Sequence, residues 1–341
     1  MTPKAAVPSR GGGFVLAGAF VTEAARGVLA IVGACGIWGF ATLYYKAMAH
    51  VPPLEVLAHR SLWTLVLFGA VLLLQRRGGE VMALLRGPMR GRVMLAGAIV
   101  ALNWGLFIWT IQAGHAVQAS LGYYIFPLVT VVMGVVLLKE RLSRGQAAAV
   151  GLAAFAVVVL TWGLGVAPWM ALALAFSFAP YMLLKKKLQA AASVSVTAEV
   201  LVIAPFALAL LAWAHAGGLV LGRAGGMFGT NLHDTLLLPV TGLITGLPLI
   251  LFSWGAQRVR LSTLGLVQYL NPTLQAVSAV WIMGEPFSRW HAMAFAMIWA
   301  ALAVYSLEGL RQDRLARRAE ARVATSGTDR NSVLTDGSAN P

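Results

Sequence analysis

Three ionisable side chains, Glu55, His59 and Arg60, lie near the start of an otherwise apolar segment of this 341-residue chain. Glu55 and His59 are four residues apart and would share one face of a helix. A histidine at such a place can carry a proton, because its unperturbed pKa is close to neutral. We therefore take Glu55 and His59 as candidate proton-coupling residues. The alternative is a structural ion cluster at the end of a helix, where long side chains reach water.

Polar side chains also recur at helical spacing in two apolar segments that lie far apart in the sequence. An unpaired amide or hydroxyl facing lipid costs several kcal/mol, so these two stripes should face other helices or a wet cavity. They predict either a cavity for a polar solute or hydrogen bonds between helices, which contribute about 0.6 kcal/mol on average. The first stripe is Ser120, Tyr123, Pro127, Thr130 and Gly134, and the second is Gln268, Asn271, Gln275 and Ser278.

A third polar group surrounds Asn103, which shares a helical face with Phe107 and Thr110. Tryptophans near the ends of membrane helices usually lie at the lipid–water interface. Trp38 and Trp104 fall too deep in their apolar segments for that, so their positions favour the wall of a cavity.

The motifs of several enzyme classes are absent from the sequence. It contains no GxxxxGK[ST] phosphate loop, no HExxH and no GxSxG, and its six histidines are scattered. Cys35 is the only cysteine, so no intramolecular disulfide can form. We expect no catalytic residues, no metal site and no cofactor.

Composition determines the class of protein, because 59% of the residues are hydrophobic and only 11% are charged. A bilayer accepts runs of about 20 apolar residues as helices, and the runs do not alternate as the strands of a membrane barrel would. The sequence thus predicts an all-α polytopic membrane protein with ten transmembrane helices. The expected spans are 27–49, 55–74, 93–113, 117–138, 145–166, 168–185, 196–216, 235–257, 261–284 and 290–309.

The net charge of +14 reflects an excess of basic residues, and their placement in the loops explains that excess. With a cytoplasmic N-terminus, all but four of the 26 Lys and Arg residues fall in cytoplasmic segments. The exceptions are Lys46, Arg60, Arg223 and Arg289. This is the positive-inside pattern, which places both termini in the cytoplasm and predicts the lipid bilayer, not nucleic acid, as a partner.

Part of the chain is repeated. Pro127 and Glu140 have counterparts 145 residues later at Pro272 and Glu285. Five spans in each half is an odd number, so the second half should enter the membrane in the opposite orientation, as in transporters built from inverted repeats. The two prolines are either hinges or static kinks, and we expect the two glutamates to stabilise loops.

These patterns divide the chain into four parts. We expect a flexible N-terminal extension (1–26), a first five-helix repeat (27–166), a second, inverted five-helix repeat (167–309) and a disordered cytoplasmic tail (310–341).

Three segments resemble the RarD-type members of the EamA family, in the drug/metabolite transporter superfamily. They read GIWGFATLYYKAMAHVPPLEVLAHRSLW (36–63), LNWGLFIWTIQAGHAVQASLGYYIFPLV (102–129) and LSTLGLVQYLNPTLQ…GEPF (261–287). The resemblance implies two inverted five-helix repeats, a bacterial inner-membrane location and secondary transport, with export of small metabolites or drugs. It further implies a substrate cavity lined by Trp38, Tyr44, Asn103, Trp104, Tyr123, Tyr181, Thr245, Gln268 and Asn271.

We therefore predict a transporter of small neutral or zwitterionic solutes that works by alternating access. The partners that we expect are the small-molecule substrate and the bilayer. The sequence does not distinguish a homodimer from a monomer. A membrane enzyme that acts on a lipid or quinone is the alternative, and it would use the cluster that contains Glu55. A scaffold or sensor is a third interpretation.

Overall fold

The computed structural model describes residues 23–139, 142–188, 190–259, 261–309 and 311. Most of the predicted N-terminal extension and almost all of the predicted tail lie outside these residues, as does Glu140. The described part is almost entirely helical. Its elements are α1 (Glu23–Ala47), α2 (Pro53–Leu74), α3 (Gly78–Arg86), α4 (Arg90–Gln112), α5 (Ala116–Leu138), α6 (Arg144–Leu164), α7 (Trp169–Leu188), α8 (Ala192–His215), β1 (Leu219–Val220), β2 (Arg223–Ala224), α9 (Leu232–Ala256), α10 (Leu261–Gln268), α11 (Leu270–Val277), the π-helix η1 (Ser278–Ile282) and a last helix, Arg289–Gly309.

Among the described residues, eight helices are long and apolar enough to cross a membrane. They are α1, α2, α4, α5, α6, α8, α9 and Arg289–Gly309. A shorter apolar helix, Trp169–Lys185, forms most of α7. The chain is therefore a polytopic helical membrane protein, and the total of ten spans stays a prediction.

The predicted continuous helix over 261–284 is broken in the structure. It consists of α10, α11 and the π-helix η1, with a turn at Tyr269 between the first two. Pro272 has no N–H to donate to the carbonyl of Gln268, four residues earlier, which accounts for a break at this point. Pro127 stands inside α5, which remains one helix of 23 residues. The two repeated prolines thus have different effects on their helices.

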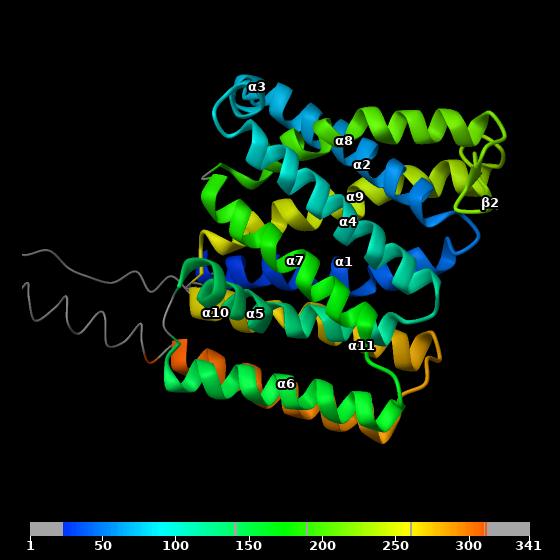
Figure 1. The fold of residues 1–341 in the computed structure, drawn as a ribbon. Helices are drawn as coiled ribbons and strands as arrows, with labels where there is room; N and C mark the ends of the chain where they lie inside the picture. Colours follow the sequence, from blue (N-terminus) through cyan, green and yellow to red (C-terminus); the bar gives the residue numbers. More distant parts are fainter. Residues whose placement is uncertain (1–22, 140–141, 189, 260, 310, 312–341) are drawn as a thin grey trace, which may run out of the picture.

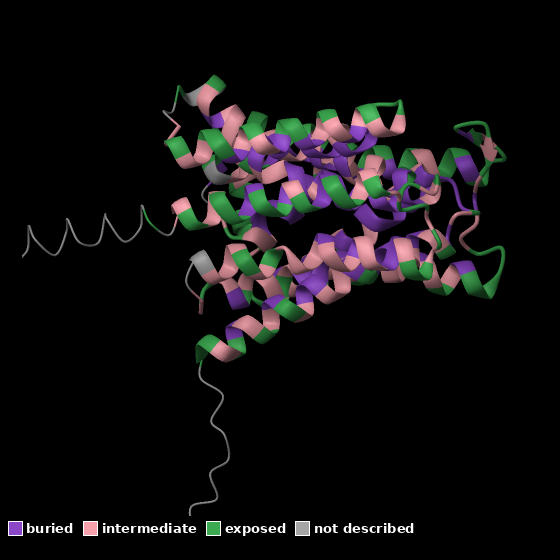
Figure 2. Cartoon of the chain, turned by 90° about the horizontal axis from the view of Figure 1, so that it is seen from below, coloured by how far each residue is buried: buried purple, intermediate pink, exposed green. Residues whose placement is uncertain are grey.

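The helices lie side by side and form one bundle (Figure 1). At one side of it α6 pairs with the last helix, and the two run antiparallel, because Gly145 lies against Glu308 while Gly163 lies against Trp290. α3 lies at the left-hand end of the view and the β1–β2 hairpin at the right-hand end. Buried residues line the faces between helices, and exposed residues cover the outer faces (Figure 2). That distribution suits a bundle whose outer apolar surface meets lipid.

Glycine lets α9 approach α2 closely. A Cβ added at Gly242 would lie 2.5 Å from the carbonyl carbon of Trp63, and one at Gly246 would lie 2.4 Å from a methyl group of Leu67. Small residues four apart commonly allow such contact between membrane helices. The GxxxG spacing therefore serves packing between α2 and α9.

Glu285 holds the start of α5. Its two carboxylate oxygens accept hydrogen bonds from the backbone N–H groups of Ala116 (2.6 Å) and Val117 (2.8 Å). A negative charge at a helix N-terminus satisfies unpaired donors and interacts well with the helix dipole. The expectation that Glu285 stabilises a loop connection is confirmed. Its repeat counterpart, Glu140, is outside the described residues.

We expect Gly242→Ala to lower the free energy of unfolding by about 1–3 kcal/mol, the usual cost of overpacking, because the backbone of Trp63 cannot move aside. Thermal unfolding of the purified protein in detergent measures the change. Gly69→Ala in α2 is the control, since a Cβ there meets no atom within 4 Å. Equal unfolding temperatures for the two variants would show that the α2–α9 contact is not tight.

Candidate functional site

A buried arginine, Arg60 of α2, connects helices from distant parts of the chain. Its Nε donates a hydrogen bond of 2.9 Å to Oγ1 of Thr245 in α9. Its guanidinium carbon lies 4.1 Å from the centre of the Trp104 ring in α4 and 5.8 Å from that of Tyr45 in α1. Only 7% of Arg60 is exposed. Four helices thus surround one positive charge.

This charge has no acidic partner among the described residues, since none of their carboxylate oxygens lies within 4.0 Å of Arg60. Glu55, five residues earlier on α2, instead accepts hydrogen bonds from backbone N–H groups between β2 and α9. The Trp104 ring offsets part of the cost of burial through a cation–π contact. A buried cation that lacks a counter-ion favours an anionic ligand, and the planar guanidinium suits a carboxylate.

The hydroxyl of Tyr45 is a second unsatisfied group next to Arg60. Tyr45 is 1% exposed, and its oxygen lies close to the hydroxyl of Thr245 but in no hydrogen bond of good geometry among the described residues. Buried polar groups are rarely left in this state, so such a group requires an explanation. A polar ligand on Arg60 would supply one.

A row of aromatic rings extends from Tyr44 in α1 through the bundle to Tyr181 in α7. Each ring contacts the next edge-on or tilted, with centres 5.5–5.9 Å apart, which is the favourable range for aromatic pairs. The row passes Arg60 at Tyr45, whose ring centre lies 5.8 Å from the guanidinium carbon. Its members in order are Tyr44, Tyr45, Phe107, Tyr123, Phe178 and Tyr181.

Asn103 is fully buried, and its amide group is already bonded. Its Nδ2 donates to the carbonyl of Leu174 (3.1 Å) and to Oγ of Ser177 (2.9 Å), both in α7. The hydroxyl of Tyr123 donates to its Oδ1 at 3.5 Å. These contacts are hydrogen bonds between α4, α5 and α7, and substrate binding by Asn103 stays a prediction.

Tyr181 belongs to a buried ionic network that the sequence did not reveal. Its hydroxyl donates to Oε2 of Glu199 (3.0 Å), and Nζ of Lys185 donates to Oε1 of the same carboxylate (2.8 Å). Lys185 also donates to the hydroxyl of Ser195. Glu199 is 1% exposed, so α7 and α8 share a paired charge inside the bundle. An acidic residue within an apolar span was the available signal.

The second polar stripe lies against α1 and α5. Asn271 is half-buried and its Oδ1 accepts a hydrogen bond from Nε2 of Gln275 (3.0 Å), whereas Gln268 is exposed at the end of α10. From α5, Ser120 donates to the carbonyl of Pro272 (2.7 Å), and Tyr124 bonds to Thr273.

The nine predicted substrate residues therefore form two groups. Each member of the first group either belongs to the aromatic row, contacts Arg60, or is hydrogen-bonded to a residue of the row. In the second group, Trp38 packs on Phe252 of α9 with ring centres 5.9 Å apart, and the other two belong to the second stripe. The first group is Tyr44, Asn103, Trp104, Tyr123, Tyr181 and Thr245, and the second is Trp38, Gln268 and Asn271.

The candidate proton-coupling residues contact the connection between α8 and α9. The carboxylate of Glu55 accepts hydrogen bonds from the N–H groups of Gly226 (3.0 Å) and Met227 (2.7 Å). The ring of His59 lies 5.2 Å from that of Phe228, and its Nε2 is buried with no partner in the part of the chain that the structure describes. The geometry gives Glu55 a structural role, and proton transfer by His59 stays a prediction.

Comparison with known proteins identifies the family of this chain. The sequence model of the EamA-like transporter family matches residues 25–162. Protein RarD of Streptomyces exfoliatus is 43% identical over 304 residues, which are 88% of this chain and 93% of that protein. The chain belongs to the EamA-like transporter family. It is of the RarD type, and it is a membrane transporter.

Further relatives agree with this assignment. An uncharacterized transporter of Vibrio cholerae serotype O1 is 40% identical over 87% of this chain and 97% of its own length. Protein RarD of Escherichia coli strain K12 is 36% identical over 85% of this chain and 96% of its own length. A solved structure titled only as the crystal structure of a protein matches 82% of this chain and 97% of its own with a TM-score of 0.54. At 21% identity, that structure supports the fold alone.

We expect Glu55→Gln to destabilise this transporter. The carboxylate accepts hydrogen bonds from two backbone N–H groups, whereas the amide has only one oxygen, so its NH₂ group would face one of these donors. An unpaired buried donor costs about 1–3 kcal/mol. Thermal unfolding in detergent measures the loss, with Glu80→Gln as the control on an exposed glutamate. Should Glu55→Gln unfold like the wild type, the structural role is wrong and proton coupling becomes the better explanation.

Proposed function

We propose that this EamA-like transporter is a secondary transporter of the inner membrane, with both termini in the cytoplasm, that exports small zwitterionic solutes by alternating access. Arg60 would bind the anionic group of the solute, and the aromatic row would contact its apolar part. The sequence did not distinguish between neutral and zwitterionic solutes as the substrate. The buried charge of Arg60 favours the zwitterion, because a neutral solute would leave that charge uncompensated.

The element boundaries support a duplicated architecture with domains 27–166 and 167–309. α6 begins at Arg144 and the last helix begins at Arg289, which are 145 residues apart. The offset that aligns Pro127 with Pro272 therefore also aligns the starts of these two helices.

The connections within the two halves support opposite orientations in the membrane. α3 connects α2 to α4, and the β1–β2 hairpin connects α8 to α9 in the matching place of the second half. These two connections lie at opposite ends of the bundle (Figure 1). Inverted halves of this kind form a site that can open to either side in turn.

The single observation that carries the proposal is the place of Arg60 between the halves. Its stacking partners, Tyr45 and Trp104, belong to the first half, and its hydrogen-bond partner Thr245 belongs to the second. Any movement of one half against the other changes the surroundings of this charge. A solute bound there can therefore couple its own binding to that movement, because it can stabilise one arrangement more than the other.

A thermal-stability screen with matched ligands tests the substrate class. Each pair would compare an aromatic or aliphatic amino acid with its amide, so that the two members differ at the carboxylate. Ligands that bind the native state raise the unfolding temperature by mass action. We expect stabilisation by members with a free carboxylate. Equal shifts within pairs, or no shift in any pair, would contradict a carboxylate-binding role for Arg60.

We further expect Arg60→Met to abolish that stabilisation while the ligand-free protein stays as stable as the wild type or becomes more so. Replacing a buried charge by an apolar side chain of similar length is often neutral or favourable. Arg258→Gln is the matched control, since Arg258 also stacks on a tryptophan, Trp254 at 3.7 Å, but is partly exposed and paired with Glu23. Ligand-free Arg60→Met that unfolds much more easily would instead assign Arg60 to the scaffold.

A further inference from the structure

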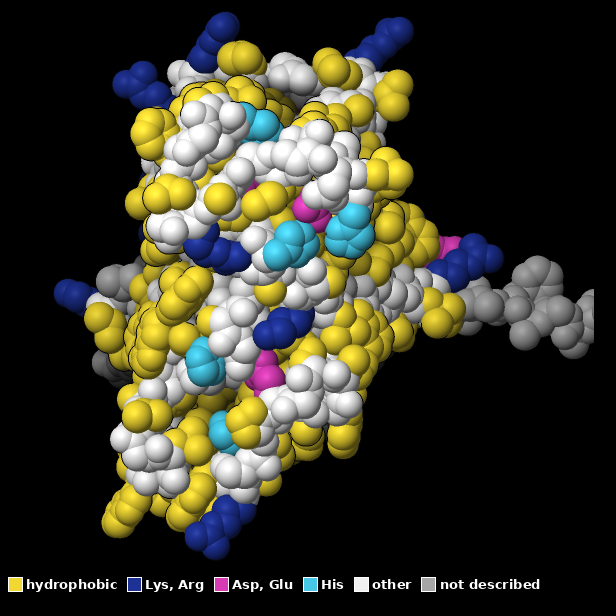
Figure 3. Space-filling model, turned by 90° about the vertical axis from the view of Figure 1, so that its right-hand side faces the viewer, with side chains coloured by type: hydrophobic (Ala, Val, Ile, Leu, Met, Phe, Trp, Pro, Cys, Tyr) yellow, Lys and Arg dark blue, Asp and Glu magenta, His cyan; other side chains and the backbone are white. Residues whose placement is uncertain are grey.

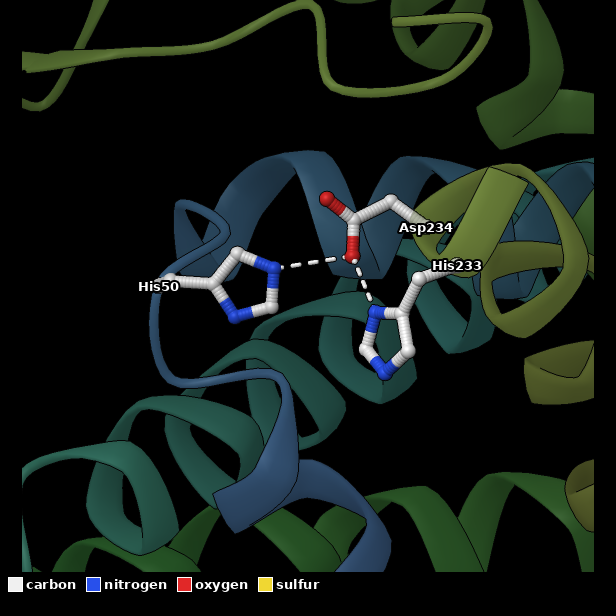
Figure 4. Close-up of side chains that lie close together, drawn as sticks. All are labelled: His50, His233 and Asp234. Atoms are coloured by element: carbon white, nitrogen blue, oxygen red, sulfur yellow. Dashed lines mark hydrogen bonds and ion pairs between the residues drawn. The ribbon is translucent and has the colours of Figure 1, made fainter. Parts of the chain in front are cut away.

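Three side chains with metal-binding atoms meet at one end of the bundle, outside the candidate substrate site. Oδ1 of Asp234 lies 2.8 Å from Nε2 of His50 and 3.0 Å from Nδ1 of His233 (Figure 4). All three ligand atoms lie within 4.8 Å of one another. His50 follows α1, and the other two begin α9, so residues 183 positions apart converge on one point.

The carboxylate of Asp234 is held in place by a neighbour that does not take part in the cluster. Nδ2 of Asn231 donates to Oδ2 of Asp234 at 2.8 Å, and Oδ1 of Asn231 accepts from the backbone N–H of Asp234 at 2.8 Å. Oδ1 of Asp234 is thereby directed at the two imidazoles. Metal sites commonly hold their ligands through outer hydrogen bonds of this kind.

The histidine side of the cluster is open to solvent. The side chains of His50 and His233 are 47% and 66% exposed, whereas that of Asp234 is 3% exposed. The end of the bundle that faces the viewer in Figure 3 carries histidine and charged side chains among apolar ones. An ion can reach the cluster from water, and water molecules can complete its coordination.

The position of His50 is fixed from a second direction. A terminal guanidinium nitrogen of Arg223, in the β1–β2 hairpin, donates to the carbonyls of Ala49 (2.7 Å) and His50 (2.8 Å). The two histidine rings lie 6.2 Å apart between centres. Both nitrogens already lie within 4.8 Å of each other and of the Asp234 oxygen, so they can approach one ion.

We propose that His50, His233 and Asp234 form a binding site for a divalent transition-metal ion, with Zn²⁺ as the best fit. Two imidazoles and one carboxylate with an open fourth position match the three-ligand zinc sites in which water completes a tetrahedron. Nitrogen ligands favour Zn²⁺ over Mg²⁺ and Ca²⁺, which require oxygen. On binding, Nε2 of His50 and Nδ1 of His233 would present lone pairs to the ion in place of hydrogen bonds to Asp234, with the ring protons on the opposite nitrogens.

Such an ion would join the connection after α1 to the start of α9. These segments belong to the two halves defined above, so a bound ion would oppose their separation at this end. This consequence for transport depends on the proposed function, but the existence of the site does not. A direct binding measurement therefore tests the site whatever the outcome for transport.

The test is calorimetric titration of Zn²⁺ into the full-length protein in detergent, without a polyhistidine tag and after removal of metal. We expect one saturable site per chain, no comparable binding of Mg²⁺, and a rise in unfolding temperature with Zn²⁺. His50→Ala and His233→Ala should each weaken binding by more than about 10-fold, since even loss of an outer hydrogen-bond partner commonly costs that much.

His115→Ala is the control, because His115 is an exposed histidine outside the cluster, beside the start of α5. It should bind Zn²⁺ like the wild type, and all three variants should keep the unfolding temperature of the metal-free protein within a few degrees. Absence of saturable binding would overturn the proposal. So would a site that His50→Ala and His233→Ala leave unchanged, because other donors would then hold the ion.

Discussion

The candidate substrate site of this bundle is organised around a positive charge that is buried without a negative partner among the described residues. Arg60 lies on the face of Trp104, and its one described hydrogen bond is to Thr245. In a membrane protein such a charge is costly and usually marks a functional site. The stacking contact and the hydrogen bond reduce that cost and leave the terminal nitrogens of the guanidinium without a described partner. The helices α1, α2, α4 and α9 meet around this charge.

Three carboxylates of the described bundle are paired, and the contrast with Arg60 is informative. Glu199 accepts from both Lys185 and Tyr181, and Glu285 accepts from the first backbone N–H groups of α5. Glu55 bonds to the backbone next to the hairpin. Each of these carboxylates fixes one segment against another. Arg60 is different because its partners are a ring and a hydroxyl, which would stabilise it less than a carboxylate.

Close helix packing makes these contacts possible. Gly242 and Gly246 bring α9 against α2, which sets Thr245 beside Arg60. At the end of the same helix, Asn231 orients Asp234 toward the histidines of the candidate metal site. A single helix thus contributes to both candidate sites, and it connects the substrate-binding region to the end where His50 lies. Movement of α9 relative to α2 would alter both sites together.

The sequence by itself determined the class of the protein, its main helices, its family and a repeat offset of 145 residues, because long apolar runs and matched segments are local features of a chain. It also indicated Tyr44, Tyr123 and Tyr181 of the aromatic row as single candidates. Only the tertiary structure decided that Arg60 lacks an acidic partner, that Lys185 pairs with Glu199, and that His50 meets His233. Those facts depend on side chains brought together from distant positions, and no spacing along the chain records them. The chain breaks its helix before Pro272 but continues it through Pro127, although each proline removes one backbone hydrogen bond. The packing around each proline determines whether its helix continues, and that packing also depends on the tertiary structure.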